Sequence, residues 1–255
     1  MAVTVNCDMG EAFGIWRLGD DEGCMPFITH ANIACGYHAS DPRTMWRTVR
    51  LAKRHGVRVG AHPGLPDREG FGRREMKLSR EEVTALVLYQ VGALDAFLRA
   101  ENMRMSHLKP HGALMGMAMN DPAVAEGIAD AAAALDLSVI GVGNCIMEQV
   151  FAARGQPLTC EFYADLNYDD RGWQIITMHH EAVDPNAAAA KVLRAVNEGR
   201  ARSVNGREVV VKADSICVHS DTPGAVAVAK AVWTALASHL DRREPAVPCR
   251  PDRGP

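Results

Sequence analysis

Short runs of apolar and β-branched residues alternate along the chain with longer amphipathic or alanine-rich runs. The short runs predict strands, and in chain order they read VTVNC, ITHANIAC, VRVGAH, MSHLKP, LSVIGV, LTCEFYA and SICVHS. The longer runs predict helices over residues 41–55, 79–101, 121–135, 185–200 and 223–240. This alternation is typical of βα units arranged around a parallel sheet.

The starts of several predicted helices carry local signals. Asp41 and Asp121 each precede a proline, which combines a capping carboxylate with a residue suited to the first helical turn. Ser79 stands three positions before Glu82, the spacing of a capping box. These signals support the helix assignments independently of the apolar pattern.

The number of βα units predicts the fold class. About seven units in 255 residues favour a seven-stranded TIM-like (β/α) barrel over an open, doubly wound sheet. We expect one barrel domain over residues 1–243, because no low-complexity tract divides it. Residues 244–255, rich in proline and arginine, are expected to form an extended tail.

Charge and cysteine content narrow the class of protein. With 28 basic and 31 acidic residues the net charge is -3, so neither nucleic acid nor an anionic membrane is an expected partner. No apolar run approaches the length of a membrane span and no leader pattern is visible, so we expect a soluble, cytoplasmic protein. The seven cysteines lack a CxxC pair, which predicts reduced, buried thiols.

Polar residues recur where the predicted strands end. In chain order they are Asp8, Glu11, Asn32, His38, His62, Lys109, His111, Glu161, Asp165, His219 and Asp221. Because the carboxyl ends of parallel strands meet at one face of a barrel, we expect these side chains to form one site. The histidines at 30, 55, 107 and 239 fall within strands or helices, where a structural role is the expected one.

Two chemistries fit this set of residues, and the sequence leaves both open. In the first, Asp8, His38 and His62 bind a divalent metal ion that activates water. In the second, Lys109 and His111 polarise a carbonyl while Asp8 or Glu11 transfers protons. The residues expected to contact the substrate are Asn32, His38, His62, Asp165, His219 and Asp221, of which His38 and His62 are also the candidate metal ligands.

Several segments resemble one known family. NCDMGEAFG, ITHANIACGYHASDP, GVRVGAHPGLPDREGFGRR and HLKPHGAL are similar to the motifs of the LamB/YcsF family, and the resemblance runs from about residue 4 to about residue 240. It implies a seven-stranded barrel akin to the glycoside hydrolase and deacetylase barrels. It also implies ATP-dependent opening of 5-oxoproline to L-glutamate, together with two partner subunits, B and C of 5-oxoprolinase.

One departure from the family pattern bears on the substrate. The segment YADLNYDD places Leu166 where the resemblance leads us to expect an arginine, and leucine cannot form the paired hydrogen bonds that a substrate carboxylate would require. Arg171 or the His179-His180 pair could replace it, or the substrate could be another cyclic amide. A metal-dependent, deacetylase-like hydrolase and a noncatalytic scaffold subunit remain alternatives, and a homo-oligomer is possible.

The chain lacks the common nucleotide-binding and nucleophile motifs. No GxxxxGK[ST] phosphate loop, GxSxG elbow or GxGxxG turn follows a predicted strand. We therefore expect ATP to be used by the complex, with partner subunits contributing phosphoryl transfer.

Overall fold

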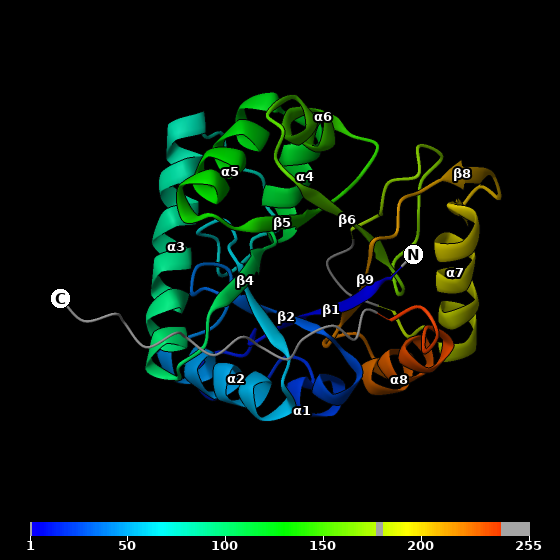
Figure 1. Ribbon diagram of the computed structural model, residues 1–255, viewed down its shortest axis with the longest axis horizontal. Helices are drawn as coiled ribbons and strands as arrows, with labels where there is room; N and C mark the ends of the chain where they lie inside the picture. The colour runs from blue at the N-terminus through cyan, green and yellow to red at the C-terminus, as the bar shows by residue number, and fades with distance from the viewer. Residues whose placement is uncertain (1, 177–180, 241–255) are drawn as a thin grey trace.

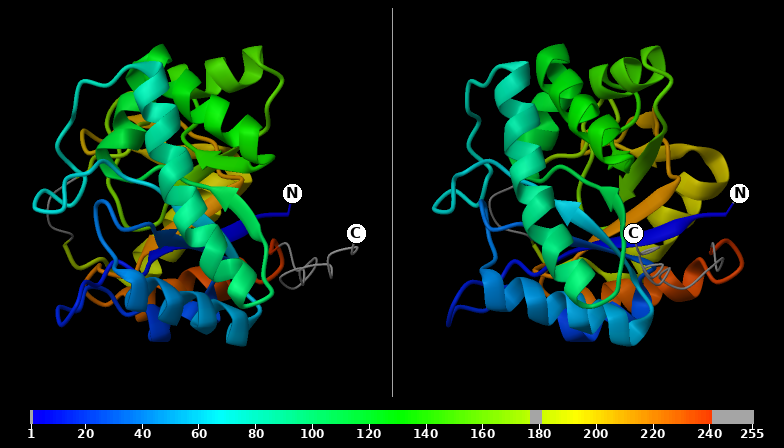
Figure 2. Two further views of the ribbon diagram at one scale, coloured as in Figure 1. Left: turned by 90° about the vertical axis from the view of Figure 1, so that its left-hand side faces the viewer. Right: turned by 60° about the vertical axis from the view of Figure 1, so that its left-hand side comes forward.

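Seven parallel strands close into a barrel that is surrounded by helices (Figures 1 and 2). The computed structural model describes residues 2–176 and 181–240. The barrel strands, in order around it, are β1 (Thr4–Met9), β2 (His30–Ala34), β3 (Arg58–His62), β4 (Met105–Leu108), β5 (Ser138–Gly141), β6 (Leu158–Tyr163) and β9 (Ser215–His219). The prediction of a seven-stranded TIM-like barrel is confirmed. The tail expected over residues 244–255 lies outside the described residues.

The helices form the outer layer. They are α1 (Asp21–Cys24), η1 (Met25–Phe27), α2 (Pro42–His55), α3 (Arg80–Ala100), α4 (Gly112–Asn120), α5 (Pro122–Leu135), α6 (Ile146–Ala153), α7 (Pro185–Glu198) and α8 (Ala225–Ala235). Helices α3 to α6 cover one flank of the barrel, whereas α1, α2 and α8 cover another (Figures 1 and 2).

The capping signals in the sequence form as predicted. Asp41 accepts hydrogen bonds from the first backbone N–H groups of α2, and Asp121 does the same for α5. Ser79 and Glu82 form both bonds of the capping box at the start of α3. These side chains satisfy N–H groups that lack a partner within the helix, and so fix where each helix begins.

Two predicted helices are shorter in the structure. The helix expected over 185–200 ends at Glu198, because Gly199 takes a left-handed conformation and the next residues form an antiparallel hairpin of β7 (Arg200–Arg202) and β8 (Glu208–Val210). The helix expected over 223–240 is α8, which ends at Ala235. The hairpin lies between β6 and β9 in the chain but forms a separate two-stranded sheet. Strand β9 therefore pairs directly with β6 in the barrel.

Helix α3 is long and apolar enough to cross a bilayer by length and composition alone. Here it is a barrel helix that packs on α5 and β3. Its buried residues recur at helical spacing and include Val83, Val87, Leu94 and Leu98. The apolar face of α3 therefore packs against the barrel.

The strand register brings polar side chains into one layer of the barrel. Asp8 on β1 is level with Asn32 on β2 and with His219 on β9. Asn32 is in turn level with Gly60 on β3, which lies beside His107 on β4. Side chains alternate between the two faces of a strand, so this register decides which residues share the barrel interior.

The cysteines lie in the core. The six in the described part of the chain are buried and carry free thiols, as the sequence predicts, and Cys249 lies outside it.

Candidate active site

A buried lysine lies at the bottom of the site. Lys109 follows β4, is 1% exposed, and places its ammonium 2.8 Å from Asp8 Oδ1 and 3.0 Å from Glu161 Oε2. It also donates to Asn6 Oδ1 at 3.3 Å and to Cys217 Sγ at 3.1 Å. The lysine, which follows β4, is thus a cation shared by carboxylates on β1 and β6.

The carboxylate of Asp8 is held in its ionised form. Burial alone would raise its pKa, but the interactions of Asp8 with His62 and Lys109 outweigh burial and hold the pKa well below the ordinary value. For Lys109, burial alone would lower the pKa of the ammonium. The neighbouring acidic groups, above all Asp8, outweigh burial and raise this pKa well above its usual range. The two residues form a stable ion pair at neutral pH.

Amide side chains orient Asp8 from below. Asn32 Nδ2 donates to Asp8 Oδ1 at 2.7 Å and to Asn6 Oδ1 at 2.8 Å, and His107 Nε2 lies 2.7 Å from Asn32 Oδ1. His30 packs edge-on against His107, with ring centroids 5.2 Å apart. These contacts support a structural role for His30 and His107 and leave Asp8 Oδ2 facing upward.

Asp8 Oδ2 lies between two histidines. His62 Nε2 is 3.3 Å away and His219 Nε2 is 3.6 Å away. On its other side, His219 Nδ1 donates to Asp165 Oδ1 at 2.9 Å. Burial alone would lower the pKa of His219, but Asp165 reverses this and raises it to about 9. His219 is therefore a cation at neutral pH.

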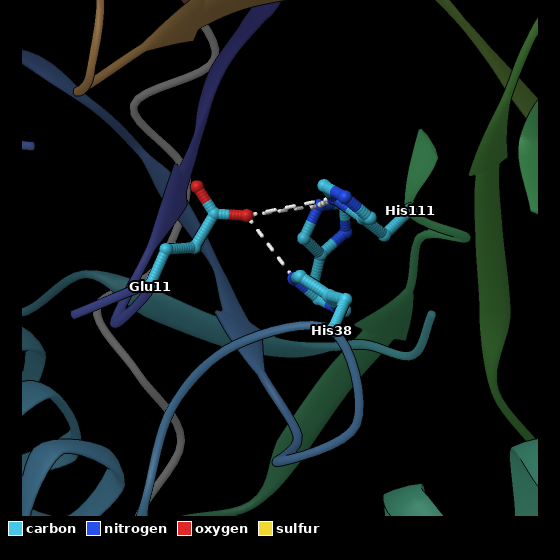
Figure 3. Close-up of side chains that lie close together, drawn as sticks. Glu11, His38 and His111 are labelled. Atoms are coloured by element: carbon cyan, nitrogen blue, oxygen red, sulfur yellow. Dashed lines mark hydrogen bonds and ion pairs between the residues drawn. The ribbon is translucent and has the colours of Figure 1, made fainter. Parts of the chain in front are cut away.

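A second group of buried side chains lies beside Asp8. Glu11 Oε1 is 3.1 Å from His38 Nε2, 3.5 Å from His111 Nδ1 and 4.0 Å from His62 Nε2. Figure 3 shows the Glu11 carboxylate pointing toward the rings of His38 and His111. Burial, followed by repulsion from Asp8, raises the pKa of Glu11 well above its ordinary value. Burial also lowers the pKa of His38 and of His111.

A pocket opens above these groups at the carboxyl ends of the strands. Its charged or polar lining includes Asp8, Glu11, His62, Arg73, Lys109, His111 and His219, and its apolar lining includes Met115, Leu166 and Ile176. Small-molecule sites commonly combine a few converging polar groups with an apolar wall. The position at the strand ends is where barrel enzymes place their chemistry.

Several of the residues predicted from the sequence do not line the pocket. Asn32 and Asp165 lie behind it, bonded to Asp8 and His219 respectively. His38 reaches it through Glu11. Asp221 is half-buried in a neighbouring hollow that Asp20 also lines.

Comparison with known proteins places the chain in a family. The profile of the LamB/YcsF family matches residues 3–248. The chain belongs to the LamB/YcsF family. The resemblance read from its motifs is thereby confirmed.

Relatives and a solved structure extend over nearly the whole chain. The A subunit of 5-oxoprolinase from Geobacillus kaustophilus is 45% identical over 238 residues, covering 92% of this chain and 93% of that protein. The protein of the same name from Bacillus licheniformis is 44% identical, covering 90% and 92% respectively. The crystal structure of the lactam utilization protein from Thermus thermophilus is 43% identical with a TM-score of 0.85, covering 93% of this chain and 97% of that one.

The structure shows what stands at position 166, where the LamB/YcsF resemblance leads us to expect an arginine. Leu166 is buried in the pocket wall. Arg171 is not part of the lining, because its guanidinium pairs with Asp169 and lies over the Trp173 ring. His179 and His180 lie outside the described residues. Arg73 does line the pocket.

The sequence reasoning missed two polar residues of this LamB/YcsF site. Arg73 lies in the long segment between β3 and α3, where no strand end marks it. Tyr163 ends β6; its hydroxyl donates to Glu161 at 2.6 Å and its ring stacks on His219. The alternation that places Glu161 in the barrel interior also places Tyr163 there, so this signal was present in the sequence.

The pair of Asp165 and His219 predicts a pH dependence of stability. A histidine whose pKa rises from 6.5 to about 9 on folding contributes stability that is fully present below pH 6.5 and is lost as the pH rises through about 9. The shift corresponds to roughly 3 kcal/mol. We expect Asp165→Asn to lose this contribution, so its free energy of unfolding should fall less than that of the wild type between about pH 6 and pH 9.5. Urea unfolding at both pH values measures it, and equal falls would contradict the assignment.

Proposed function

We propose that this chain is the A subunit of an ATP-dependent 5-oxoprolinase, which opens 5-oxoproline to L-glutamate together with B and C subunits. The observation that carries the proposal is the pairing of Asp8 with Lys109 at 2.8 Å, at the strand ends of a barrel that matches proteins named as A subunits of 5-oxoprolinase over 90% or more of the chain. We place this activity in the cytoplasm, where ATP is available.

ATP is needed because a five-membered lactam is a resonance-stabilised amide that water attacks slowly. Phosphorylation of the amide oxygen gives an activated imidate, whose carbon is a better electrophile. Overall, 5-oxoproline, ATP and two water molecules give L-glutamate, ADP and phosphate, with the ring C–N bond and the terminal phosphoanhydride bond of ATP broken. We assign phosphoryl transfer to the partner subunits and attack by water on the activated lactam to this chain.

The residues around Asp8 suit that hydrolytic step. Asp8 Oδ2 faces the pocket and is proposed to orient the attacking water and accept its proton; a weak base suffices because the substrate is activated. The cationic His219 is proposed to stabilise the negative charge that develops on the lactam or phosphate oxygen. Lys109 is a positioning residue, since its ammonium is taken up by contacts with Asp8 and Glu161.

Arg73 is proposed to bind the carboxylate of 5-oxoproline. It lines the pocket, and its guanidinium lies over the Phe71 ring at 5.1 Å. An arginine fork is suited to a carboxylate because it forms paired hydrogen bonds. This assignment would make the leucine at position 166 compatible with the substrate.

Glutamate release tests the proposal. The purified full-length chain would be assayed with 5-oxoproline, with and without ATP and the B and C subunits from its own source. We expect release only in the complete mixture. Release without ATP or partners would instead support a stand-alone hydrolase, and no release with folded partners would overturn the substrate assignment.

A pair of arginine variants tests the carboxylate site. We expect Arg73→Gln to raise the KM for 5-oxoproline by about tenfold or more, corresponding to a lost charge-assisted hydrogen bond of about 1.5–3 kcal/mol. Arg171→Gln is the matched control and should leave KM unchanged, because its side chain is 65% exposed and pairs with Asp169. A KM that changes only in Arg171→Gln would transfer the role to that residue.

A further inference from the structure

Two histidine nitrogens face each other in the site at a separation that needs an explanation. His62 Nε2 and His111 Nδ1 are 3.0 Å apart. The other nitrogen of His62 lies 2.8 Å from the backbone oxygen of Lys109, and the other nitrogen of His111 lies 2.8 Å from that of Phe71. A carbonyl oxygen only accepts, so each of those nitrogens carries the hydrogen. In the neutral rings, the two facing nitrogens therefore both present lone pairs.

Glu11 adds a further oxygen atom beside this pair of nitrogens. Glu11 Oε1 is 3.5 Å from His111 Nδ1 and 3.1 Å from His38 Nε2. A carboxyl group carries at most one hydrogen and does not lie between the two facing nitrogens, so Glu11 does not relieve the contact between their lone pairs. All four ligand atoms lie within 4.8 Å of one another, and all four residues are buried. One carboxyl oxygen and three imidazole nitrogens thus lie close together, and a cation bound between them would be favourable.

The separations match those of a coordination shell. Metal bonds of about 2.0–2.1 Å in tetrahedral geometry place neighbouring ligand atoms roughly 3.3 Å apart. The measured separations of 3.0, 3.1 and 3.5 Å lie close to this value, and that between Glu11 and His62, at 4.0 Å, is somewhat longer. Metal-binding histidines also commonly donate their second N–H to a backbone carbonyl, as His62 and His111 do.

We propose that Glu11, His38, His62 and His111 bind one divalent first-row transition-metal ion. Imidazole and carboxylate donors suit zinc best among the common candidates, because zinc accepts a tetrahedral set of nitrogen and oxygen ligands. The site differs from the set of Asp8, His38 and His62 expected from the sequence. Asp8 borders this group, with Oδ2 3.3 Å from His62 Nε2 and Oδ1 bonded to Lys109 and Asn32.

His38 is held in place for this role by packing. Its ring stacks face to face on that of His111, with centroids 3.6 Å apart and planes 2° from parallel. Gly64 is closely packed against the ring, so a side chain there would displace it. His38 Nδ1 is buried and has no hydrogen-bond partner among the described residues. With neither nitrogen fixed by a carbonyl, His38 is free to direct the lone pair of Nε2 toward the metal ion.

A bound ion would contribute to the chemistry of the pocket without depending on the proposed substrate. Zinc supplies a Lewis acid and lowers the pKa of a bound water. Metal binding is measured without 5-oxoproline, ATP or partner subunits. A failure of this proposal would therefore leave the proposed function standing, and the reverse also holds.

The experiment measures metal content and affinity of the full-length chain, purified without a histidine tag. After dialysis against chelator, zinc is added and binding is followed by calorimetry, with metal per chain measured by mass spectrometry. We expect one zinc ion per chain and a rise in Tm on zinc addition, because a ligand that binds only the folded state stabilises it. Cobalt substitution should give the strong visible absorption of a tetrahedral nitrogen and oxygen site.

Matched variants locate the ion. We expect His111→Gln and Glu11→Gln to weaken zinc binding by about 10- to 100-fold or more, with circular dichroism confirming that both fold. His219→Gln is the control, because it removes a buried histidine beside Asp8 without altering the proposed ligands. Loss of zinc binding in His219→Gln alone would move the site to the group formed by Asp8, Cys217 and His219.

The competing explanation is a proton shared between His62 and His111. In that case zinc would neither bind at micromolar concentration nor change the Tm of the wild type, and the proposal would be overturned. Equal zinc uptake by the wild type and His111→Gln would overturn it as well.

Discussion

Lys109→Met should reduce glutamate release by the complete 5-oxoprolinase mixture by about 10²- to 10⁴-fold, the range contributed by positioned proton-transfer groups. The methionine cannot hold Asp8 in its ionised, oriented state. It also leaves Asp8 and Glu161 facing each other without their shared cation. Removing one partner of a buried ion pair costs about 3–5 kcal/mol, so the free energy of unfolding should fall by a comparable amount. This deficit should shrink at lower pH, where one carboxyl becomes protonated.

Steady-state glutamate release and urea unfolding check this prediction. Lys212→Met is the control, because Lys212 pairs with Glu148 at the surface and its loss should cost less than about 1 kcal/mol. If Lys109→Met does not fold, adding Glu161→Gln removes one of the two opposed charges and should restore stability without restoring turnover. A single variant that keeps more than about a tenth of the activity would remove Lys109 from the mechanism.

Gly60→Ala should destabilise the barrel and lower turnover together. A Cβ at this position would lie much closer than van der Waals contact to three atoms of the His107 ring, so the ring would have to move. His107 bonds to Asn32, which in turn orients Asp8, so displacement of the ring should disturb Asp8. Overpacking of this kind costs about 1–3 kcal/mol.

The same measurements on Gly92→Ala provide the control. Gly92 lies in α3, and outside that helix's own backbone no atom of the described residues lies within 4 Å of the position that a Cβ would take. Alanine there should stabilise the helix by about 0.5–1 kcal/mol without changing activity. If Gly60→Ala keeps the stability and turnover of the wild type, the His107 ring can move without cost. That result would contradict the role of His107 and Asn32 in orienting Asp8.

The parts of the fold that could be predicted are those with local signals. Strands appear as short apolar runs, and α2, α3 and α5 begin with capping side chains. Helices α4 and α6 were missed for a physical reason, since neither begins with a side chain that caps its backbone. Their stability comes from tertiary packing, which the local sequence does not reveal.

The sequence predicts which residues form the site better than it predicts which of them contact one another. The position of Asp8, His62 and Lys109 at strand ends follows from the βα pattern. The contact between His62 and His111 depends on backbone carbonyls that become neighbours only in the barrel. Arg73 lies in a long connection where residue type alone gives no reason to single it out.

The closure of the barrel has a consequence for folding kinetics. The hydrogen bond between Thr4 and Ser215 joins residues 211 positions apart, and β1 pairs with β9 along most of its length. Such distant pairings are slow to form, because the chain between them must first be ordered. During synthesis, the edge of β1 that pairs with β9 stays unpaired until β9, the last barrel strand, has been made. Partly made chains are therefore expected to expose a strand edge that invites aggregation, and the ionised Asp8 becomes fully enclosed only in the last step.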